Sequence, residues 1–142
     1  MISCTEFIAA YNELFKFIDR RYGKKAVLKF WEGISDNFLG NLEKLVRQKG
    51  IQGMKQYWRH TLAEEAAYYR IKAGKNKFKI ELAQCPSIGL LRKKKIKVYK
   101  DYCRHCDTLY RRIIEKYGFD YTINYLDEKK GECRLEVTRR QK

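Results

Sequence analysis

The stretch DYCRHCDTLY, residues 101–110, gathers residue types that could do chemistry. Two thiols, an imidazole and a carboxylate lie within five positions of one another: Cys103, His105, Cys106 and Asp107. A thiol pair at this spacing is part of many metal sites, and a thiol beside a base is the arrangement of an activated nucleophile. Because cysteine is also often fully buried, two core cysteines with polar neighbours are a third interpretation.

A long helix, expected from about Lys97 to Tyr117, would position these side chains. Residues at spacings of three and four share one face of a helix, and here they are Tyr99, Cys103, Cys106, Tyr110, Ile113 and Tyr117. In an ideal helix His105 lies roughly 100° from Cys106 and roughly 160° from Cys103. We therefore expect both thiols to face inward, toward a sheet, and His105 to be more exposed than either thiol.

Two further cysteines lie in or next to predicted strands. Cys133 alternates with Leu135 and Val137 along an apolar strand face, so we expect it to approach the helix thiols. Cys85 stands before Pro86, which cannot donate to a strand ladder and ends the preceding strand. A regular strand would point Cys85 away from the apolar face, although the turn at Pro86 could redirect it.

The cysteines leave the three interpretations open. In the metal hypothesis Cys103 and Cys106 form a C-x-x-C pair. Cys85 and Cys133 would then complete a tetrathiolate site for zinc or an iron–sulfur centre. In the core interpretation Cys103, Cys106 and Cys133 are small apolar residues. In the third, a thiol and Asp107 act on a substrate in a cleft, and the Arg and Lys residues of the helix lower the thiol pKa.

The charge of the chain is strongly positive, with 32 Lys and Arg against 17 Asp and Glu and a net charge of +15. Such a charge attracts nucleic acids, anionic membrane surfaces and small anionic molecules alike. The densest stretch is RKKKIK, residues 92–97. No zinc-finger spacing, recognition-helix pattern or aromatic-rich RNA motif accompanies it, so charge alone supports nucleic-acid binding.

Composition and hydropathy narrow the class of protein. Aromatic residues make up 14% of the chain, which is typical of a globular protein. No apolar run approaches the roughly 20 residues of a membrane span, and the first residues lack the pattern of a signal peptide. We therefore expect no membrane span and a cytoplasmic protein, whose five cysteines are thiols or metal ligands rather than disulfides.

The sequence pattern predicts one domain over residues 1–142 with an α+β fold. The first half, 1–74, is predicted to hold four helices, the last from about Gln52 to Ala73. The second half, 75–142, is predicted to form a β-α-β-β unit: a strand ending near Cys85, the long helix, and a closing hairpin around the turn DEKKG. The expected fold is thus a helical N-terminal half packed against a small sheet that contains antiparallel strands.

Three motifs resemble the L-2-amino-thiazoline-4-carboxylic acid hydrolase family. They are QCPSIGLL, YCRHCD and GECRLEV, in that order, with a helix and a hairpin between them. Members show a Cys-Pro segment, a Cys with an Asp four residues on, and a Cys in a closing strand, which Cys85, Cys103 with Asp107, and Cys133 match. GECRLEV is also similar to the closing motif of 4-vinyl reductase domains, which are small-molecule or metal-binding modules. The resemblance covers about residues 78–138.

The resemblance implies a hydrolase that opens a cyclic amidine by adding water to the carbon between ring nitrogen and sulfur. It assigns catalysis to Cys103 and Asp107, with Asp107 as general base, and substrate binding to Cys85 and Cys133. A small anionic substrate suits the basic surroundings. The first alternative is a metal- or ligand-binding module without catalysis, with zinc or an iron–sulfur centre on the thiols. The second is a nucleic-acid-binding protein that uses the basic surface.

Overall fold

Helices come first along the chain, and the strands of the sheet follow. The computed structural model describes residues 4–64 and 67–141, with the side chains of residues 7–63 and 67–141. In chain order the elements are α1 (Cys4–Tyr22), α2 (Lys24–Phe38), α3 (Gly40–Lys49), α4 (Ile51–Glu64), β1 (Tyr68–Ala73), β2 (Lys77–Gln84), α5 (Pro86–Lys93), a 3₁₀ turn (Tyr102–Arg104), α6 (His105–Lys116), β3 (Phe119–Asp127) and β4 (Glu132–Arg139).

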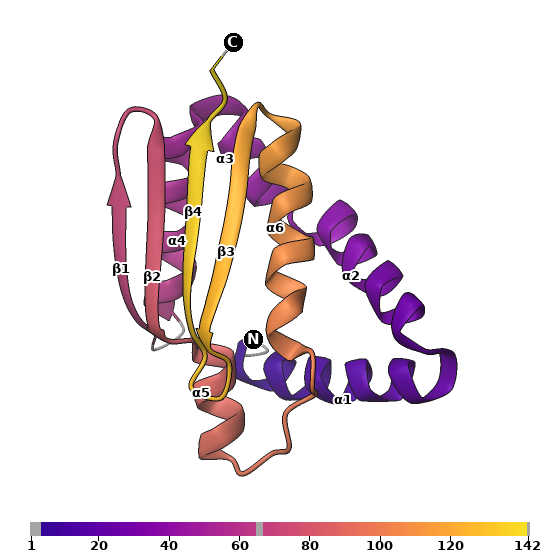
Figure 1. The fold of residues 1–142 in the computed structure, drawn as a ribbon. Coiled ribbons are helices and arrows are strands. Elements are labelled where there is room, and N and C mark those ends of the chain that lie inside the picture. The colour runs from indigo at the N-terminus through magenta and orange to yellow at the C-terminus, as the bar shows by residue number, and fades with distance from the viewer. Residues whose placement is uncertain (1–3, 65–66, 142) are drawn as a thin grey trace.

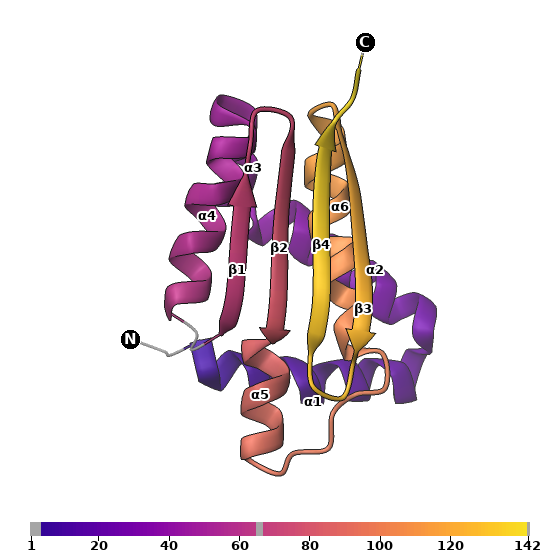
Figure 2. The same cartoon turned by 60° about the vertical axis from the view of Figure 1, so that its left-hand side comes forward.

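The strands form one antiparallel sheet in the order β1-β2-β4-β3. In the central pair, Leu82 of β2 lies opposite Cys133 of β4, and Glu81 lies opposite Arg134. Because successive side chains point to opposite faces, the first pair belongs to the inner face and the second to the outer face. The helices α1 to α4 and α6 lie on the inner side of the sheet, and α5 continues from one end of β2 (Figures 1 and 2).

Two apolar clusters make up the core. The first packs α3, α4 and α6 against the sheet, and in it Trp58 stacks on Phe78 with ring centroids 5.4 Å apart. The second joins α1, α2 and α5 to residues 99–109 around Phe15, whose ring centroid lies 5.5 Å from that of Trp31. Burial of these side chains is the main force that holds the helices on the sheet.

Asn12 of α1 ties the segment before α6 to the second cluster. Its side chain is fully buried, with 0% of its surface exposed. The amide nitrogen donates to the carbonyl oxygen of Lys97 at 3.0 Å, and the amide oxygen accepts from the backbone N–H of Tyr99 at 2.8 Å. A buried amide is stable only when its polar atoms are paired in this way. The bonds hold residues 97–99 outside helical geometry.

The prediction of a fourth helix that reaches Ala73 is wrong. Helix α4 ends at Glu64, and Tyr68–Ala73 forms strand β1. This segment pairs with β2, with Ile71 opposite Ile80. The pairing of two strands across a short turn outweighs the local helical pattern, because β propensity depends on neighbours that periodicity does not show.

The prediction of one helix from Lys97 to Tyr117, which would include residues 101–110, is also wrong. A 3₁₀ turn covers Tyr102–Arg104, and the α-helix begins only at His105. The residues PSIG, 86–89, expected as a turn, lie in helix α5, with the proline in its first turn. Proline is favoured there because its missing N–H would be unpaired in any case. The sheet unit therefore has the order β-β-α-α-β-β rather than β-α-β-β.

Other predictions about the fold are confirmed. The fold is α+β, with helices concentrated in the first half. Strand β2 ends at Gln84, next to Cys85, and the predicted closing hairpin is β3 and β4. No helix within residues 4–64 and 67–141 is long and apolar enough to cross a membrane.

Candidate functional site

A cavity of about 470 Å³ lies where the two core clusters meet. We call it the junction cavity; its walls come from both clusters and include Ile34, Trp58, Leu62, Leu109, Ile123 and Leu135. In the part of the chain that the structure describes, no Lys, Arg, Asp or Glu side chain lines it. Two of its lining residues, Phe7 and Phe38, are 47% and 75% exposed, so the cavity reaches the surface between α1 and the end of α2.

Three thiols line the junction cavity: those of Cys85, Cys106 and Cys133. Cys133 lies on the inner face of β4, as its alternation with Leu135 predicts. Cys85 lies at the start of α5, where its backbone N–H donates to the carbonyl oxygen of Gly131 at 2.9 Å. The turn into α5 thus redirects Cys85 from the strand direction into the cavity wall.

Two thiols of the cavity wall, those of Cys85 and Cys133, are held in the protonated form. Burial raises the pKa of Cys85 to about 11 and that of Cys133 to about 12. The neighbouring thiol of Cys106 adds a smaller effect in the same direction for both. A thiolate is disfavoured in an apolar environment, so neither side chain is a ready nucleophile at neutral pH.

The half-buried ring of His105 packs against aromatic rings of the core, and the prediction that it leans outward is wrong. Its ring centroid lies 5.0 Å from that of Tyr102, 5.7 Å from Phe15 and 6.3 Å from Trp31. Burial lowers the pKa of the imidazole, which favours the neutral form. The physical reason is the 3₁₀ turn before His105. The predicted direction of the ring assumed a rotation of 100° per residue from Tyr99 onward, and a 3₁₀ turn does not keep that rotation.

The imidazole forms a pair with the thiol of the next residue. Nδ1 of His105 lies at hydrogen-bond distance from the carbonyl oxygen of Tyr102, and since a carbonyl only accepts, Nδ1 carries the proton. Nε2 then has a free lone pair, and the Sγ of Cys106 lies 3.7 Å from it. Periodicity assigned the two residues to different sides of a helix and therefore missed this pair. The sequence signal that remains is their adjacency.

Cys103 does not line the junction cavity but a neighbouring crevice of about 370 Å³. The crevice runs between α5, residues 98–102 and the turn after β3, and Arg92, Lys100 and Lys129 line it. The Sγ of Cys103 is 4.0 Å from the carbonyl oxygen of Glu128. Burial, followed by the nearby thiols, raises the pKa of Cys103, so this thiol is also held protonated.

Asp107, the predicted general base, is bound to Arg111. Its Oδ1 accepts from Nη2 of Arg111 at 2.7 Å and from Nε at 3.0 Å. Arg111 also donates to the carbonyl oxygen of Tyr121 at 2.8 Å, which fixes its position against β3. Among the described lining residues of the junction cavity and of the Cys103 crevice, Asp107 does not occur. The structure does not bring Cys103 and Asp107 to one cavity, and their catalytic role stays a prediction.

The metal hypothesis also stays a prediction. Within the described side chains, no group of three or more His, Cys, Asp or Glu residues is arranged to hold a metal ion. The cysteines at 85, 103, 106 and 133 form no disulfide with a described residue. The separation of Cys103 from the cavity explains why the tetrathiolate set is not gathered, since four ligands of zinc must converge on one point.

The basic stretch, residues 92–97, lies at the end of α5 and in the loop after it. The side chains of its five cations are exposed and make no ion pair with a described acidic residue. They are Arg92, Lys93, Lys94, Lys95 and Lys97. Nucleic-acid binding here still rests on charge alone and stays a prediction.

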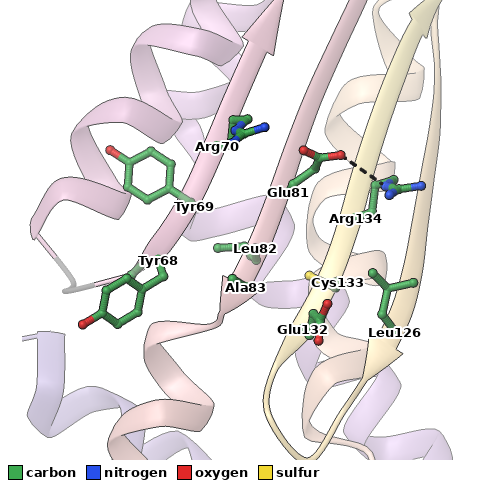
Figure 3. A pocket seen from close by; sticks show the side chains of 11 residues that line it. Tyr68, Tyr69, Arg70, Glu81, Leu82, Ala83, Leu126, Glu132, Cys133 and Arg134 are labelled. Carbon is green, nitrogen blue, oxygen red and sulfur yellow. Dashed lines mark ion pairs between the residues drawn. The ribbon is translucent and has the colours of Figure 1, made fainter.

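A groove of about 560 Å³ crosses the outer face of the sheet over β1, β2 and β4 (Figure 3). Glu81 and Arg134 lie side by side in it, with Oε1 and Nε 3.6 Å apart. Tyr68 and Arg70 stand along its β1 side. Cys133 and two carboxylates, those of Glu81 and Glu132, also line the groove, but no described contact joins the thiol to either carboxylate. The junction cavity, where His105 faces Cys106, therefore remains the better candidate site.

Comparisons with known proteins give no family. No protein-family model matches the chain, and no curated protein sequence matches it. Among solved structures, it is similar to an Fe(II) unliganded H-NOX protein mutant from K. algicida, with a TM-score of 0.35 and 10% identity over 99% of this chain. The chain spans 65% of that protein's length. A similarity at this level defines neither fold nor function, and the resemblance to the hydrolase family stays a prediction.

Gly131 lets the turn after β3 pack on Cys85, and this contact gives a first test. Its φ is +73°, and a Cβ there would lie 2.7 Å from Cβ of Cys85 and 2.9 Å from Cβ of Ile88. We expect Gly131→Ala to lower the free energy of unfolding by roughly 2–5 kcal/mol, from left-handed backbone strain plus overpacking. Gly118→Ala is the control, since its φ is +81° but no described atom lies within 4 Å of the added Cβ.

Gly118→Ala should lower the free energy of unfolding by only about 1–2 kcal/mol, because it adds backbone strain without overpacking. Urea unfolding of the two variants measures the difference. Equal losses in both would contradict the close packing that directs Cys85 into the cavity.

Proposed function

We propose that the protein is a cytoplasmic small-molecule-binding module that holds a mostly apolar ligand in the junction cavity. The observation that carries the proposal is the cavity itself, about 470 Å³ of space lined by apolar side chains at the centre of the core. Small-molecule sites commonly have volumes of about 300–1,000 Å³ and mostly apolar walls. The absence of a disulfide among the described cysteines is consistent with the proposed cytoplasmic location.

A few polar groups in the wall can orient such a ligand. Thr61, Ser87 and Tyr102 bring hydroxyl groups to the junction cavity, and His105 brings its imidazole. A small number of placed polar groups in an apolar wall gives a site specificity without a large desolvation cost. Because no charged side chain lines the cavity in the described part of the chain, the proposed ligand is uncharged over most of its surface.

Binding of an uncharged fluorescent probe, N-phenyl-1-naphthylamine, tests this function. Thr61 lines the cavity from α4 and is half-buried, so Thr61→Trp should fill part of the cavity while the fold is retained. We expect the native protein to bind one probe per chain, and the variant to bind at least about tenfold more weakly, or about 1.4 kcal/mol. Fluorescence titration measures both affinities.

Arg59→Trp is the matched control. Arg59 is exposed on the same helix, so this substitution places a Trp outside the cavity. It should bind the probe as the native protein does. Thermal unfolding confirms that both variants are folded. Absence of saturable binding by the native protein, or equal binding by Thr61→Trp, would contradict the proposal.

The crevice at Cys103 favours a second candidate function, the binding or hydrolysis of a small anionic molecule. Three cations line it, and two of them, Arg92 and Lys129, make no ion pair with a described residue. This arrangement supports the anionic substrate that the family resemblance implies. The crevice does not include the proposed base Asp107, so the catalytic part of this candidate rests on the resemblance.

The direct assay uses L-2-amino-thiazoline-4-carboxylic acid and follows thiol release. If the candidate is correct, Cys103→Ser and Asp107→Asn abolish turnover. Arg92→Gln removes one charge contact with the substrate and raises KM about tenfold, which corresponds to about 1.4 kcal/mol of binding free energy. Lys72→Gln, on strand β1 away from the crevice, should leave KM unchanged. No turnover by the native protein would remove the hydrolase candidate.

A further inference from the structure

His105 and Cys106 have the relative geometry of a base and a nucleophile. The bond from Nδ1 of His105 to the carbonyl oxygen of Tyr102 fixes the tautomer, and Nε2 faces the Sγ of Cys106 at 3.7 Å. The rings of Phe15, Trp31 and Tyr102 surround the imidazole and limit its rotation. A nucleophile next to a base that a third group orients is the recurring arrangement of covalent catalysis.

Position and environment distinguish Cys106 from the other thiols of the junction cavity. Cys85 and Cys133 line the same cavity, yet among the described contacts only Cys106 has an imidazole nitrogen within reach. Cys106 is also the second residue of α6, where the helix dipole favours a negative charge. Of the three thiols, Cys106 is therefore the one with a base placed to accept its proton.

The cavity restricts the chemical class of the reacting ligand. Its wall is apolar and holds no charged side chain in the described part of the chain, so a neutral molecule with an apolar chain is preferred. Addition of a thiol to a conjugated double bond releases no leaving group, so it suits a cavity whose described wall holds no charged side chain to receive one.

We propose that Cys106 adds covalently to apolar α,β-unsaturated carbonyl compounds in the junction cavity, with His105 as its base. The proton of the Cys106 thiol passes to Nε2 of His105, and Sγ forms a bond to the β-carbon of the ligand. The electron pair of the double bond moves toward the carbonyl group as an enolate. The imidazolium then returns the proton to the α-carbon, so the product is a thioether and no oxidant or reductant is needed.

The proposal rests on the proposed ligand-binding function, because the ligand must enter the junction cavity. It goes beyond that function by naming the electrophile class and the residue that reacts. Hydroxyl groups of Ser87 and Tyr102 line the same wall and suit the carbonyl oxygen of such a ligand. The site would therefore capture apolar unsaturated aldehydes and ketones as thioethers.

The test exposes the purified protein to trans-2-nonenal and follows the intact mass and the modified peptide. We expect one adduct per chain, on Cys106. Cys106→Ser should abolish that adduct, while Cys103→Ser should react at the native rate because Cys103 lies outside the cavity. His105→Phe keeps an aromatic ring among its neighbours and should slow the reaction at least about tenfold, as loss of a general base does.

A second reagent separates capture in the cavity from general thiol reactivity. Acrylamide carries a conjugated carbonyl but no apolar chain. The ratio of the nonenal rate to the acrylamide rate at Cys106 should therefore be at least about tenfold higher in the folded protein than in the unfolded chain, where both reagents meet an exposed thiol. Equal relative rates, an adduct mainly on Cys103, or a native rate in His105→Phe would overturn the proposal.

Probe binding distinguishes this failure from failure of the proposed function. The native protein is therefore titrated with N-phenyl-1-naphthylamine alongside the nonenal reaction. If the probe binds and nonenal does not select Cys106, ligand binding stands and the covalent step is wrong. If the native protein does not bind the probe, both are wrong.

Discussion

The two hydrogen bonds of the Asn12 side chain decide how the cysteines are arranged. They hold the backbone of residues 97–99 against α1 and keep this segment out of the following helix. The chain then passes through a 3₁₀ turn, and α6 begins at His105. This start turns His105 and Cys106 toward the junction cavity and leaves Cys103 in the crevice beside α5. A continuous helix would have placed both thiols on one face.

The same arrangement separates the apolar site from the charge of the chain. The net charge is +15, yet the described cations lie outside the junction cavity, where water solvates them. An anionic ligand therefore has its best site in the crevice lined by Arg92, Lys100 and Lys129, and an apolar ligand in the junction cavity. Each thiol takes its chemistry from the environment in which the fold places it.

Local patterns predicted the parts of the fold that local forces decide. Alternation gave the hairpin of β3 and β4 and the inward direction of Cys133, because strand side chains alternate strictly. Strand β1 was missed because its partner β2 outweighs a helical pattern. The position of His105 was missed because Asn12, 87 residues before Tyr99 in the chain, sets the start of α6. No periodicity within the segment carries that information.

Xenon binding in a crystal tests the central claim, that the junction cavity is an apolar space able to hold a ligand beside His105 and Cys106. Apolar cavities of sufficient size stay free of ordered water and bind xenon. The account predicts, in crystals under xenon pressure, at least one xenon atom in contact with Leu109, Leu135 and Cys106. A cavity filled by ordered water, or closed by side chains of α1 and α4 packed on the sheet, would contradict it.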